Sequence, residues 1–424
     1  MSRKILVIGN GGREHALSWA LLKSPSVELV VCVPGNGGTE LLPGCENRSL
    51  SVDDFASIVS LIRQENIDFV VVGPELPLSL GIVDTLRKEG ILVFGPNQEG
   101  AKIESSKAWA KDLFQSAGIP TAESATFNDL TSAQSYVNKK GVPIVLKADG
   151  LAAGKGVIVA MTLDEAQEAL LSLFGQGYTK IIVEEYLVGE EVSVLALTDG
   201  KDFRLLLPAQ DHKRIGEGNT GLNTGGMGAY CPANILTPEL EEQIKNKIFW
   251  PTISELQKRG IEYCGVLYAG LMISPDGIAK ILEYNCRFGD PETQAILPLL
   301  KTPLDELFIA CIAKELKEFP PLEWHEYTSV CVIAASGGYP ESYEKGKIIT
   351  GVDSQDDDIL VFQAGTRLEN DDLLTDGGRV LGVTAIGSDF GVARKKAYEK
   401  INQIHFEGMY FRRDIANNQE KRPK

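Results

Sequence analysis

Three polar side chains alternate along an apolar stretch near the end of a possible strand. In EYNCRFGDPETQ (283–294), Glu283, Asn285 and Arg287 are spaced two residues apart. If the segment is extended, all three point to one face, because side chains alternate along a strand. Glutamate and asparagine oxygens suit Mg²⁺, which completes its ligand shell with phosphate and water. Arg287 would then meet the γ-phosphate of a nucleotide and the charge that develops in its transfer. The alternative is a salt-bridged strand end, which would not need the asparagine.

A glycine-rich stretch, GNGGREH (9–15), follows the first apolar run. It would begin a helix, whose free backbone amides attract anions. The dinucleotide fingerprint is incomplete, since Glu14 occupies its third glycine position and no acidic residue ends the second strand. A nicotinamide cofactor is therefore disfavoured. A turn that only reverses the chain is one alternative. Arg13 favours a phosphate or ribose contact, because a guanidinium can hold phosphate oxygens bidentately.

A second glycine-rich stretch, ADGLAAGKGV (148–157), resembles a P-loop but is not one. Gly156 follows Lys155, so the hydroxyl that a P-loop needs for magnesium is missing. A loop of small residues between two strands could instead close over a triphosphate, with Lys147 at the end of the first strand. The alternative is a mobile hairpin loop that binds nothing.

The segment VEEYLVGEE (183–191) has the pattern of a hinge. An apolar strand ends in acidic residues, turns at Gly189 and resumes after Glu191. Its backbone could bind an adenine edge while a carboxylate accepts ribose hydroxyls. By itself the signal is weak, because acidic strand ends are usually just solvated.

Composition limits the class of protein. A chain of 424 residues indicates two to four domains. The net charge of −16 argues against nucleic-acid or anionic-membrane binding. The seven cysteines have no metal-ligand spacing and are expected to be buried thiols in a reducing compartment. We find no signal-peptide core and no bilayer-spanning run, and we expect a cytoplasmic protein.

The helices and strands that must position these residues follow the pattern of an α/β protein, with α+β parts. Four short runs rich in valine and isoleucine, alternating with helical segments, predict a Rossmann-like parallel sheet within the first hundred residues. Residues 101–118 are predicted to form one helix, and 237–259 another. The joint SPDG (274–277) predicts an antiparallel hairpin. A small mixed domain follows from about residue 328.

Several motifs together resemble the ATP-grasp fold: Lys107, Lys147, the AAGKG loop, EEYL with Glu191, and E-x-N-x-R. More narrowly, the chain resembles the phosphoribosylamine–glycine ligase (glycinamide ribonucleotide synthetase) family, from about residue 3 to about residue 413. The motifs that carry this narrower resemblance are GNGGREHAL, PGNGGT, GPE-x-PL, DHKR, NTGGMGAY, YAGLM, EYNCRFGDPETQ and GGRVLGVTAIG.

The resemblance implies an ATP-grasp fold with a Rossmann-like N-terminal domain, an inserted lid and a small C-terminal domain. We place the N-terminal substrate domain at 1–101, the core at 102–122 and 191–327, the lid at 123–190 and the C-terminal domain at 328–424. The implied reaction joins glycine to 5-phosphoribosylamine with ATP and Mg²⁺ or Mn²⁺, giving glycinamide ribonucleotide, ADP and phosphate. We expect small-molecule substrates only, and a monomer.

The lid loop and the family motifs together give a set of expected site residues, with Arg287 and Lys147 as the catalytic ones. The expected metal ligands are Glu283 and Asn285. The expected ATP-binding residues are Lys107, Lys147, Gly154, Lys155, Gly156, Glu184, Glu185, Tyr186, Leu187, Glu191 and Arg287. The candidates for phosphoribosylamine and glycine are Gly11, Gly12, Arg13, Glu14, Glu75, Asp211, Lys213, Asp290 and Glu292.

One loop departs from the family pattern. The usual DGDxGPNTGGMGAY is EGNTGLNTGGMGAY here, with Glu217, Asn219 and Leu222 in place of two aspartates and a proline. A charge is lost and we expect a less rigid loop, so its role is open.

Three other functions compete with the ligase. Another ATP-grasp ligase, such as a purine-pathway carboxylase or formyltransferase, would lack the RFGDPE turn as it stands here. A nucleotide-binding sensor would bind ATP without glycine-dependent turnover. A nicotinamide dehydrogenase is disfavoured by Glu14.

Overall fold

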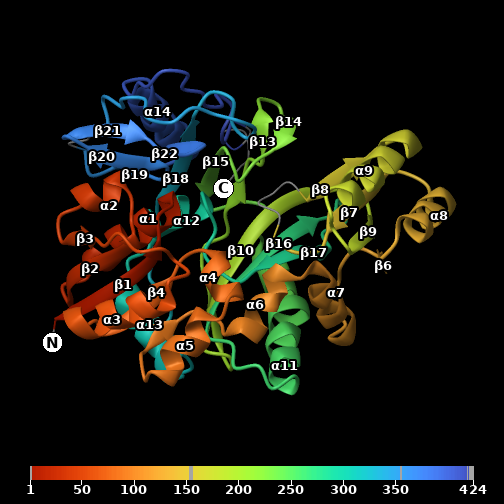
Figure 1. Ribbon diagram of the computed structural model, residues 1–424, viewed down its shortest axis with the longest axis horizontal. Helices are drawn as coiled ribbons and strands as arrows, with labels where there is room; N and C mark the ends of the chain where they lie inside the picture. Colours follow the sequence, from red (N-terminus) through yellow and green to blue (C-terminus); the bar gives the residue numbers. More distant parts are fainter. Residues whose placement is uncertain (1, 152–155, 354–355, 418, 420–424) are drawn as a thin grey trace.

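The computed structural model describes residues 2–151, 156–353, 356–417 and 419. Gly154 and Lys155, expected in the loop over the triphosphate, lie outside the described residues. Figure 1 shows the N-terminal elements on one side, the C-terminal ones above them, and residues 124–185 projecting at the opposite side.

The N-terminal sheet is parallel, as the valine-rich runs predict, with strand order β3-β2-β1-β4-β5. Helices alternate with its strands, which are buried on both faces. The strands are β1 (Arg3–Gly9), β2 (Val27–Pro34), β3 (Cys45–Asn47), β4 (Phe69–Val72) and β5 (Val93–Phe94). The helices are α1 (Gly12–Leu22), α2 (Gly37–Leu41), α3 (Phe55–Glu65), α4 (Glu75–Ser79) and α5 (Ile82–Lys88).

The prediction of one helix over residues 101–118 is wrong. The structure has two helices, α6 (Gln98–Ser105) and α7 (Lys107–Ser116). Ser106 between them is extended, and its hydroxyl accepts a hydrogen bond from the amide of Trp109 at 3.2 Å. A serine in this role caps a new helix rather than continuing the old one, and the cap places Lys107 at the start of α7.

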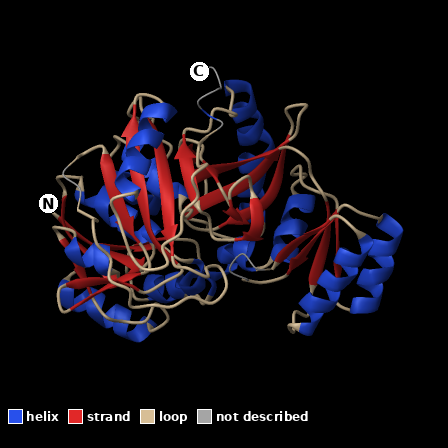
Figure 2. Ribbon diagram, turned by 90° about the horizontal axis from the view of Figure 1, so that it is seen from above, coloured by secondary structure: helices blue, strands red, loops and turns tan. Residues whose placement is uncertain are grey.

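Residues 124–185 form a separate antiparallel sheet, of order β6-β9-β7-β8, with two helices packed on it. Figure 2 shows this unit standing apart from the rest of the molecule. Its apolar side chains form a cluster of their own. The elements are β6 (Ser124–Phe127), α8 (Leu130–Lys140), β7 (Ile144–Ala148), β8 (Val157–Ala160), α9 (Leu163–Gly175) and β9 (Ile181–Glu185).

The central sheet has the order β11-β10-β16-β17, and β16 and β17 form the predicted antiparallel hairpin. The predicted helix over 237–259 is present with a π-helical turn in the middle. The strands are β10 (Glu190–Thr198), β11 (Phe203–Leu205), β16 (Gly265–Ile273) and β17 (Ala279–Asn285). The helical parts are α10 (Pro238–Ile244), the π-helical turn (Lys245–Phe249) and α11 (Trp250–Lys258).

The C-terminal sheet has the order β12-β15-β18-β22-β19. Two of its strands come from the middle of the chain and precede the C-terminal segment by about a hundred residues. The strands are β12 (Gln210–Asp211), β15 (Gly228–Cys231), β18 (Thr328–Ala335), β19 (Ile359–Gln363) and β22 (Arg379–Gly387), with α14 (Phe390–Ile401) packed on the sheet.

Two hairpins and three short helical elements complete the described structure. The hairpins are β13 (Arg214–Gly216) with β14 (Thr220–Asn223), and β20 (Thr366–Glu369) with β21 (Asp372–Thr375). The helices are α12 (Glu292–Ile296), a 3₁₀ turn (Leu297–Leu299) and α13 (Leu304–Ala313). All seven cysteines are buried free thiols, as predicted. Across the described ranges, no helix combines the length and apolar character needed to cross a membrane.

Candidate active site

Glu283 and Asn285 lie on one face at the end of β17, as the alternation predicts. Arg287 lies beyond the strand and is held by two ion pairs. Its Nε is 3.1 Å from an oxygen of Glu75, and its NH2 is 3.0 Å from an oxygen of Glu104. The NH2 group also donates to Asn285 Oδ1 at 3.2 Å. The salt-bridged alternative therefore describes Arg287 here, and its contact with a phosphate stays a prediction.

The two carboxylates that hold Arg287 respond differently to burial. Burial raises the pKa of Glu104 and outweighs the lowering effect of Arg287. Burial also opposes ionisation of Glu75, but Arg287 and Arg13 together lower its pKa. Glu75 comes from α4 and Glu104 from α6, so Arg287 connects the N-terminal sheet region to the central hairpin. Glu104 is not among the residues predicted from sequence, because its helical position carries no motif.

Glu283 is surrounded by cations. Lys213 Nζ is 3.9 Å from Glu283 Oε1 and 3.2 Å from Glu191 Oε2. Burial disfavours the charged carboxylate, but Lys213, Lys147 and Lys107 outweigh it and lower the pKa of Glu283. An ionised, partly exposed carboxylate beside several lysines is suited to the meeting point of a metal and a polyphosphate.

The donor set at β17 fits a divalent metal that a substrate helps to hold. Glu283 and Asn285 offer hard oxygen atoms, the type that Mg²⁺ prefers. Within the described ranges, no cluster of three or more histidine, cysteine or acidic side chains could hold a metal by itself. The remaining ligands would have to come from phosphate and water, which is common for Mg²⁺ at nucleotide sites.

A buried ion-pair network lies where β7, β9 and α7 meet. Glu184 is buried, with Lys147 Nζ 3.0 Å from one oxygen and Lys111 Nζ 3.2 Å from the other. Lys147 also donates to the carbonyl of Leu282 at 3.1 Å, next to Glu283. Lys111 is not among the residues predicted from sequence. A signal was available, because Lys107 and Lys111 are four residues apart on one helix and face the same side.

Lys107 is fixed at the start of α7. Its Nζ donates to the carbonyl of Gly150 at 2.9 Å. Burial lowers its pKa, and the charge of Glu283 partly offsets that effect. Gly156, whose carbonyl accepts from the amide of Ala148 at 2.8 Å, is buried at the entrance of β8. The described parts of the loop, at Gly150 and Gly156, thus lie next to Lys107 and to the end of the strand that carries Lys147.

The expected adenine segment links β9 to β10. Glu185 ends β9 with its side chain 3.6 Å from Lys280, and Tyr186 and Leu187 are partly buried between the strands. Glu191 lies in β10 and pairs with Lys213. The structure therefore brings the hinge, the lysines and the β17 face to one side of the central sheet.

The glycine-rich turn at the start of α1 is braced by Glu14. The Glu14 side chain is buried, and its Oε2 accepts from the amide of Gly11 at 2.6 Å. Its Oε1 lies 2.5 Å from Arg13 Nε, and Arg13 also donates to the carbonyl of Phe288 at 3.1 Å. Glu14 at the third position of the fingerprint therefore caps the helix. A phosphate contact for Arg13 stays a prediction.

The GDPE turn (289–292) packs directly on this glycine-rich turn. A β-carbon added to Gly12 would lie 2.5 Å from Gln294 Nε2. Gln294 in turn donates to Asp290 at 2.7 Å. Arg379 of β22 lies 3.3 Å from the other Asp290 oxygen and donates to the Asp290 carbonyl at 2.7 Å. Asp290 is therefore held from two sides.

Glu292 is buried next to hydroxyl groups. Its Oε1 accepts from Ser193 at 3.1 Å and from the hydroxyl of Tyr268. Asp211 lies close enough for the charge of Glu292 to affect its pKa. Burial, Glu292 and Glu191 raise the pKa of Asp211 to about 7, against the lowering effect of Lys213. The charge of Glu191 raises the pKa of Lys213 well above its usual range, against burial. Lys213 stays charged while Asp211 titrates near neutral pH.

The loop that departs from the family pattern forms the β13–β14 hairpin. Glu217 and Asn219 both contact the segment after α14. Asn219 Oδ1 accepts from Arg412 at 3.1 Å, and Glu217 Oε1 accepts from the amide of Arg413 at 3.1 Å. Leu222 is exposed. Hairpin and segment border a cavity of about 510 Å³ that His212 and Tyr230 also line.

The antiparallel sheet of residues 124–185, the central sheet and the lysines and acids between them define an ATP-grasp protein. A biotin carboxylase domain from Hydrogenobacter thermophilus, solved with MgADP, has a TM-score of 0.72 to this chain. It is only 15% identical, and the match covers 97% of this chain and 92% of that one. That likeness shows the fold alone.

Three family models match consecutive parts of the chain. They describe the N domain (residues 3–104), the ATP-grasp (A) domain (105–293) and the C domain (329–418) of phosphoribosylglycinamide synthetase. The chain belongs to this family.

Named relatives match along almost the whole chain. A phosphoribosylamine–glycine ligase of Synechocystis is 57% identical, covering 98% of this chain and 99% of the relative. One of Vibrio vulnificus is 46% identical, covering 97% of each. A crystal structure of the Thermotoga maritima phosphoribosylamine–glycine ligase has a TM-score of 0.83 at 34% identity, covering 97% of this chain and 100% of that one.

Proposed function

We propose that this protein joins glycine to 5-phosphoribosylamine at the expense of ATP, giving glycinamide ribonucleotide, ADP and phosphate. The observation that carries the proposal is the ionised Glu283 on β17, beside Asn285 and among Lys107, Lys147 and Lys213. This is a site for a metal-bound polyphosphate. The GDPE turn and the glycine-rich loop next to it offer a separate polar surface for the other substrates.

ATP lies along the side of the central sheet where these groups meet. Lys107 and Lys147 contact its phosphates, the backbone from Glu184 to Leu187 lines the adenine, and Glu191 accepts the ribose hydroxyls. The metal is Mg²⁺ or Mn²⁺, held by Glu283 and Asn285. When bound, it neutralises phosphate charge as the γ-phosphoryl group leaves ADP.

The chemistry requires an activated carboxylate, because a carboxylate itself is a poor electrophile. A glycine carboxylate oxygen attacks the γ-phosphorus and ADP leaves, which gives glycyl phosphate. The amine of phosphoribosylamine then attacks the glycyl carbonyl, phosphate leaves with the bonding electron pair, and the proton lost by the amine goes to the released phosphate. Arg287 and Lys147 neutralise developing charge, and positioning supplies most of the rate.

Histidines are poor candidates for proton transfer here. His15 is buried and its Nδ1 accepts from the amide of Gln363 at 2.9 Å. Burial lowers the pKa of His15 to about 4 and likewise that of His212. A neutral imidazole fixed in this way orients its neighbours and does not shuttle protons at neutral pH.

Phosphoribosylamine and glycine bind between the N-terminal loop and the GDPE turn. Gly11, Gly12 and Arg13 supply amides and a cation, and Asp290 and Glu292 supply carboxylates. Residues 123–190 act as a lid that keeps water from the acyl phosphate. For the other parts we propose an N-terminal domain of residues 1–101, a core of 102–122 with 191–327, and a C-terminal domain of 328–424. We also propose that the protein is a monomer located in the cytoplasm.

The direct test is ADP release with ATP and Mg²⁺, with glycine and freshly made phosphoribosylamine added singly or together. The proposal expects full turnover only with both. Glycine-independent ADP release with another carboxylate substrate would indicate a different ATP-grasp ligase. ATP binding without turnover would indicate a sensor.

A further inference from the structure

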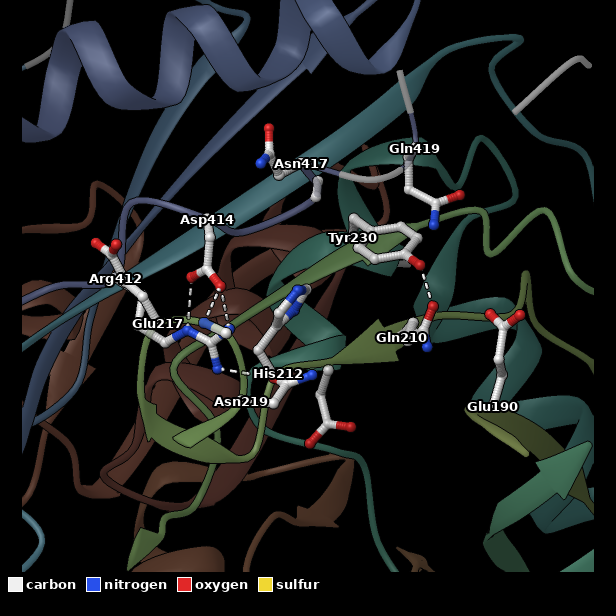
Figure 3. A pocket seen from close by; sticks show the side chains of 13 residues that line it. Glu190, Gln210, His212, Glu217, Asn219, Tyr230, Arg412, Asp414, Asn417 and Gln419 are labelled. Carbon is white, nitrogen blue, oxygen red and sulfur yellow. Dashed lines mark hydrogen bonds and ion pairs between the residues drawn. The ribbon is translucent and has the colours of Figure 1, made fainter. Parts of the chain in front are cut away.

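The β13–β14 hairpin is tied to the C-terminal segment by charged and backbone contacts. The side chain of Arg412 is 1% exposed. Its NH1 donates to the carbonyl of Arg214 at 3.0 Å. It also donates to Asn219 Oδ1 at 3.1 Å (Figure 3). Asp414 lies 2.6 Å from Arg412 and accepts from the amide of Gly218 at 2.8 Å. The first strand of the hairpin and its turn are thereby held.

The segment that holds the hairpin is itself fixed to α14. Tyr398 of that helix donates to the carbonyl of Arg412 at 2.8 Å and accepts from the amide of Ile415 at 3.1 Å. Arg394 donates to the carbonyl of Arg413 at 2.8 Å. Arg412 therefore connects a well-anchored helix to a hairpin whose other side chains are largely exposed.

Lys213 immediately precedes this hairpin and reaches the candidate active site. Its carbonyl accepts from the amide and the hydroxyl of Thr224, each at 2.8 Å, while Arg412 binds the next carbonyl in the chain. The consecutive carbonyls of Lys213 and Arg214 are thus bound by two different partners, Thr224 and Arg412. The Lys213 side chain extends to Glu191 and Glu283. Fixing the backbone at 213–214 limits where that ammonium group can lie.

We propose that Arg412 is a positioning residue, which acts through the β13–β14 hairpin to hold Lys213 between Glu191 and Glu283. Glu217 and Asn219, which depart from the family pattern, form part of the same connection to the C-terminal segment. Buried charge-assisted bonds to carbonyls suit this role, because they are costly to leave unmade. The kinetic part of this inference rests on the proposed ligase function.

A double-mutant cycle tests whether Arg412 acts through Lys213. Arg412→Met keeps an unbranched side chain close in length to the aliphatic stem of arginine and removes the guanidinium donors. We expect it to lower kcat/KM for ATP by about 10- to 100-fold. In a Lys213→Met background, the same change is expected to have less than about a twofold effect, because contacting or linked sites are not additive. Equal effects in both backgrounds would overturn the inference.

Arg204→Met is the matched control. Arg204 also donates to backbone carbonyls, those of Phe203, Lys317 and Phe319. It lies on β11, at the edge of the central sheet opposite β17. It is expected to leave kcat/KM within about twofold of the parent protein in either background. A loss as large as that of Arg412→Met would mean that a general structural defect explains both, and would contradict the inference.

Hydrogen exchange gives a readout that needs no turnover. In Arg412→Met, the amides of residues 210–224 are expected to exchange at least about tenfold faster, since they lose the contact that limits local opening. Unchanged exchange there would overturn the inference even if the wild type is an active ligase. Absence of ligase activity in the wild type would contradict the proposed function instead, and exchange would still decide this inference.

If Arg412→Met does not fold, Asn219→Gly provides a milder change. Asn219 has a positive φ of 58°, which glycine adopts without strain. The variant loses only the acceptor for Arg412. It is expected to show the same loss of kcat/KM in smaller degree, again absent in the Lys213→Met background. No loss in the wild-type background would contradict the inference.

Discussion

At the residue scale, Glu184 shows how the site holds buried charges of opposite sign together. Its carboxylate is buried and meets Lys147 and Lys111, which approach from different elements. A buried ion pair gains little net stability when formed, but removing one partner leaves a buried charge uncompensated. The arrangement holds the Lys147 ammonium group beside the carbonyl of Leu282, next to the β17 face.

Replacing the shared carboxylate should therefore destabilise the fold more than replacing one lysine. Glu184→Gln leaves two buried ammonium groups facing each other, and we expect a loss of about 3–5 kcal/mol in the free energy of unfolding. Lys111→Met leaves Glu184 paired with Lys147 and should cost less. Urea unfolding of both variants measures the difference. Equal losses would show that Glu184 does not bridge the lysines.

Glu283 is expected to act mainly on the metal. It is partly exposed, so Glu283→Gln should still fold and should destabilise the protein far less than Glu184→Gln. The apparent Mg²⁺ requirement for ADP release should rise by about tenfold or more, since even indirect partners of a metal contribute on this scale. Glu123→Gln removes a surface pair with Lys140 and serves as the control. Full activity of Glu283→Gln at limiting Mg²⁺ would refute the metal assignment.

Asp211 should make stability depend on pH. Its pKa is raised from 3.8 in the unfolded chain to about 7, so the folded state holds an extra proton between these values. The free energy of unfolding contributed by this group is therefore greatest at low pH and falls as pH rises through that window. Asp211→Asn removes this fall in the free energy of unfolding with rising pH. Its melting temperature relative to wild type should rise from about pH 5 to about pH 8. A constant difference would contradict the raised pKa.

At the element scale, the unit of residues 124–185 has a core separate from the rest. Leu170 of α9 is fully buried in that core, whereas Leu171 beside it is 53% exposed. The helix begins with a capping box, in which Thr162 and Glu165 satisfy each other's backbone amides. The separate core suits a unit that can unfold in a step of its own, joined to the rest by the contacts of Glu184 and Lys147.

Leu170→Ala should destabilise this unit selectively. Truncating a buried leucine costs about 2–5 kcal/mol, and the loss should appear as a separate early unfolding transition. Leu171→Ala, one residue along the same helix, should change stability by less than about 0.5 kcal/mol. Hydrogen exchange of β7 and β9, compared with β16, locates the transition. Simultaneous loss of protection in all three strands would argue against an independent unit.

Sequence patterns succeeded for elements with strong periodicity or turn chemistry. The parallel N-terminal strands and the hairpin around SPDG follow from apolar runs and from a Pro-Asp-Gly turn. The break at Ser106 was missed, because two adjoining helices share one apolar periodicity and only the cap separates them. The joining of β12 and β15 to the C-terminal sheet was also missed. Such pairing depends on tertiary packing and leaves no local signal.

At the scale of the whole molecule, the candidate site lies where parts distant in sequence meet. Arg379 from β22 bonds both the Asp290 carbonyl and the Gly225 carbonyl, 2.6 Å away. Asn36 donates to the carbonyl of Gln363 at 2.9 Å. Motifs indicated a set of candidate site residues, whose roles stay predictions. They did not predict that Arg287 would be shared by Glu75 and Glu104, because ion-pair choice depends on three separate elements.

The transfer of oxygen from glycine to phosphate tests the ligase mechanism most directly. With glycine labelled with ¹⁸O in its carboxylate, ATP, Mg²⁺ and phosphoribosylamine, each turnover should place one ¹⁸O in the released phosphate and leave one in the glycinamide product. Mass spectrometry of both products measures this. Unlabelled phosphate formed together with product would rule out glycyl phosphate, and absence of product would contradict the proposed ligation itself.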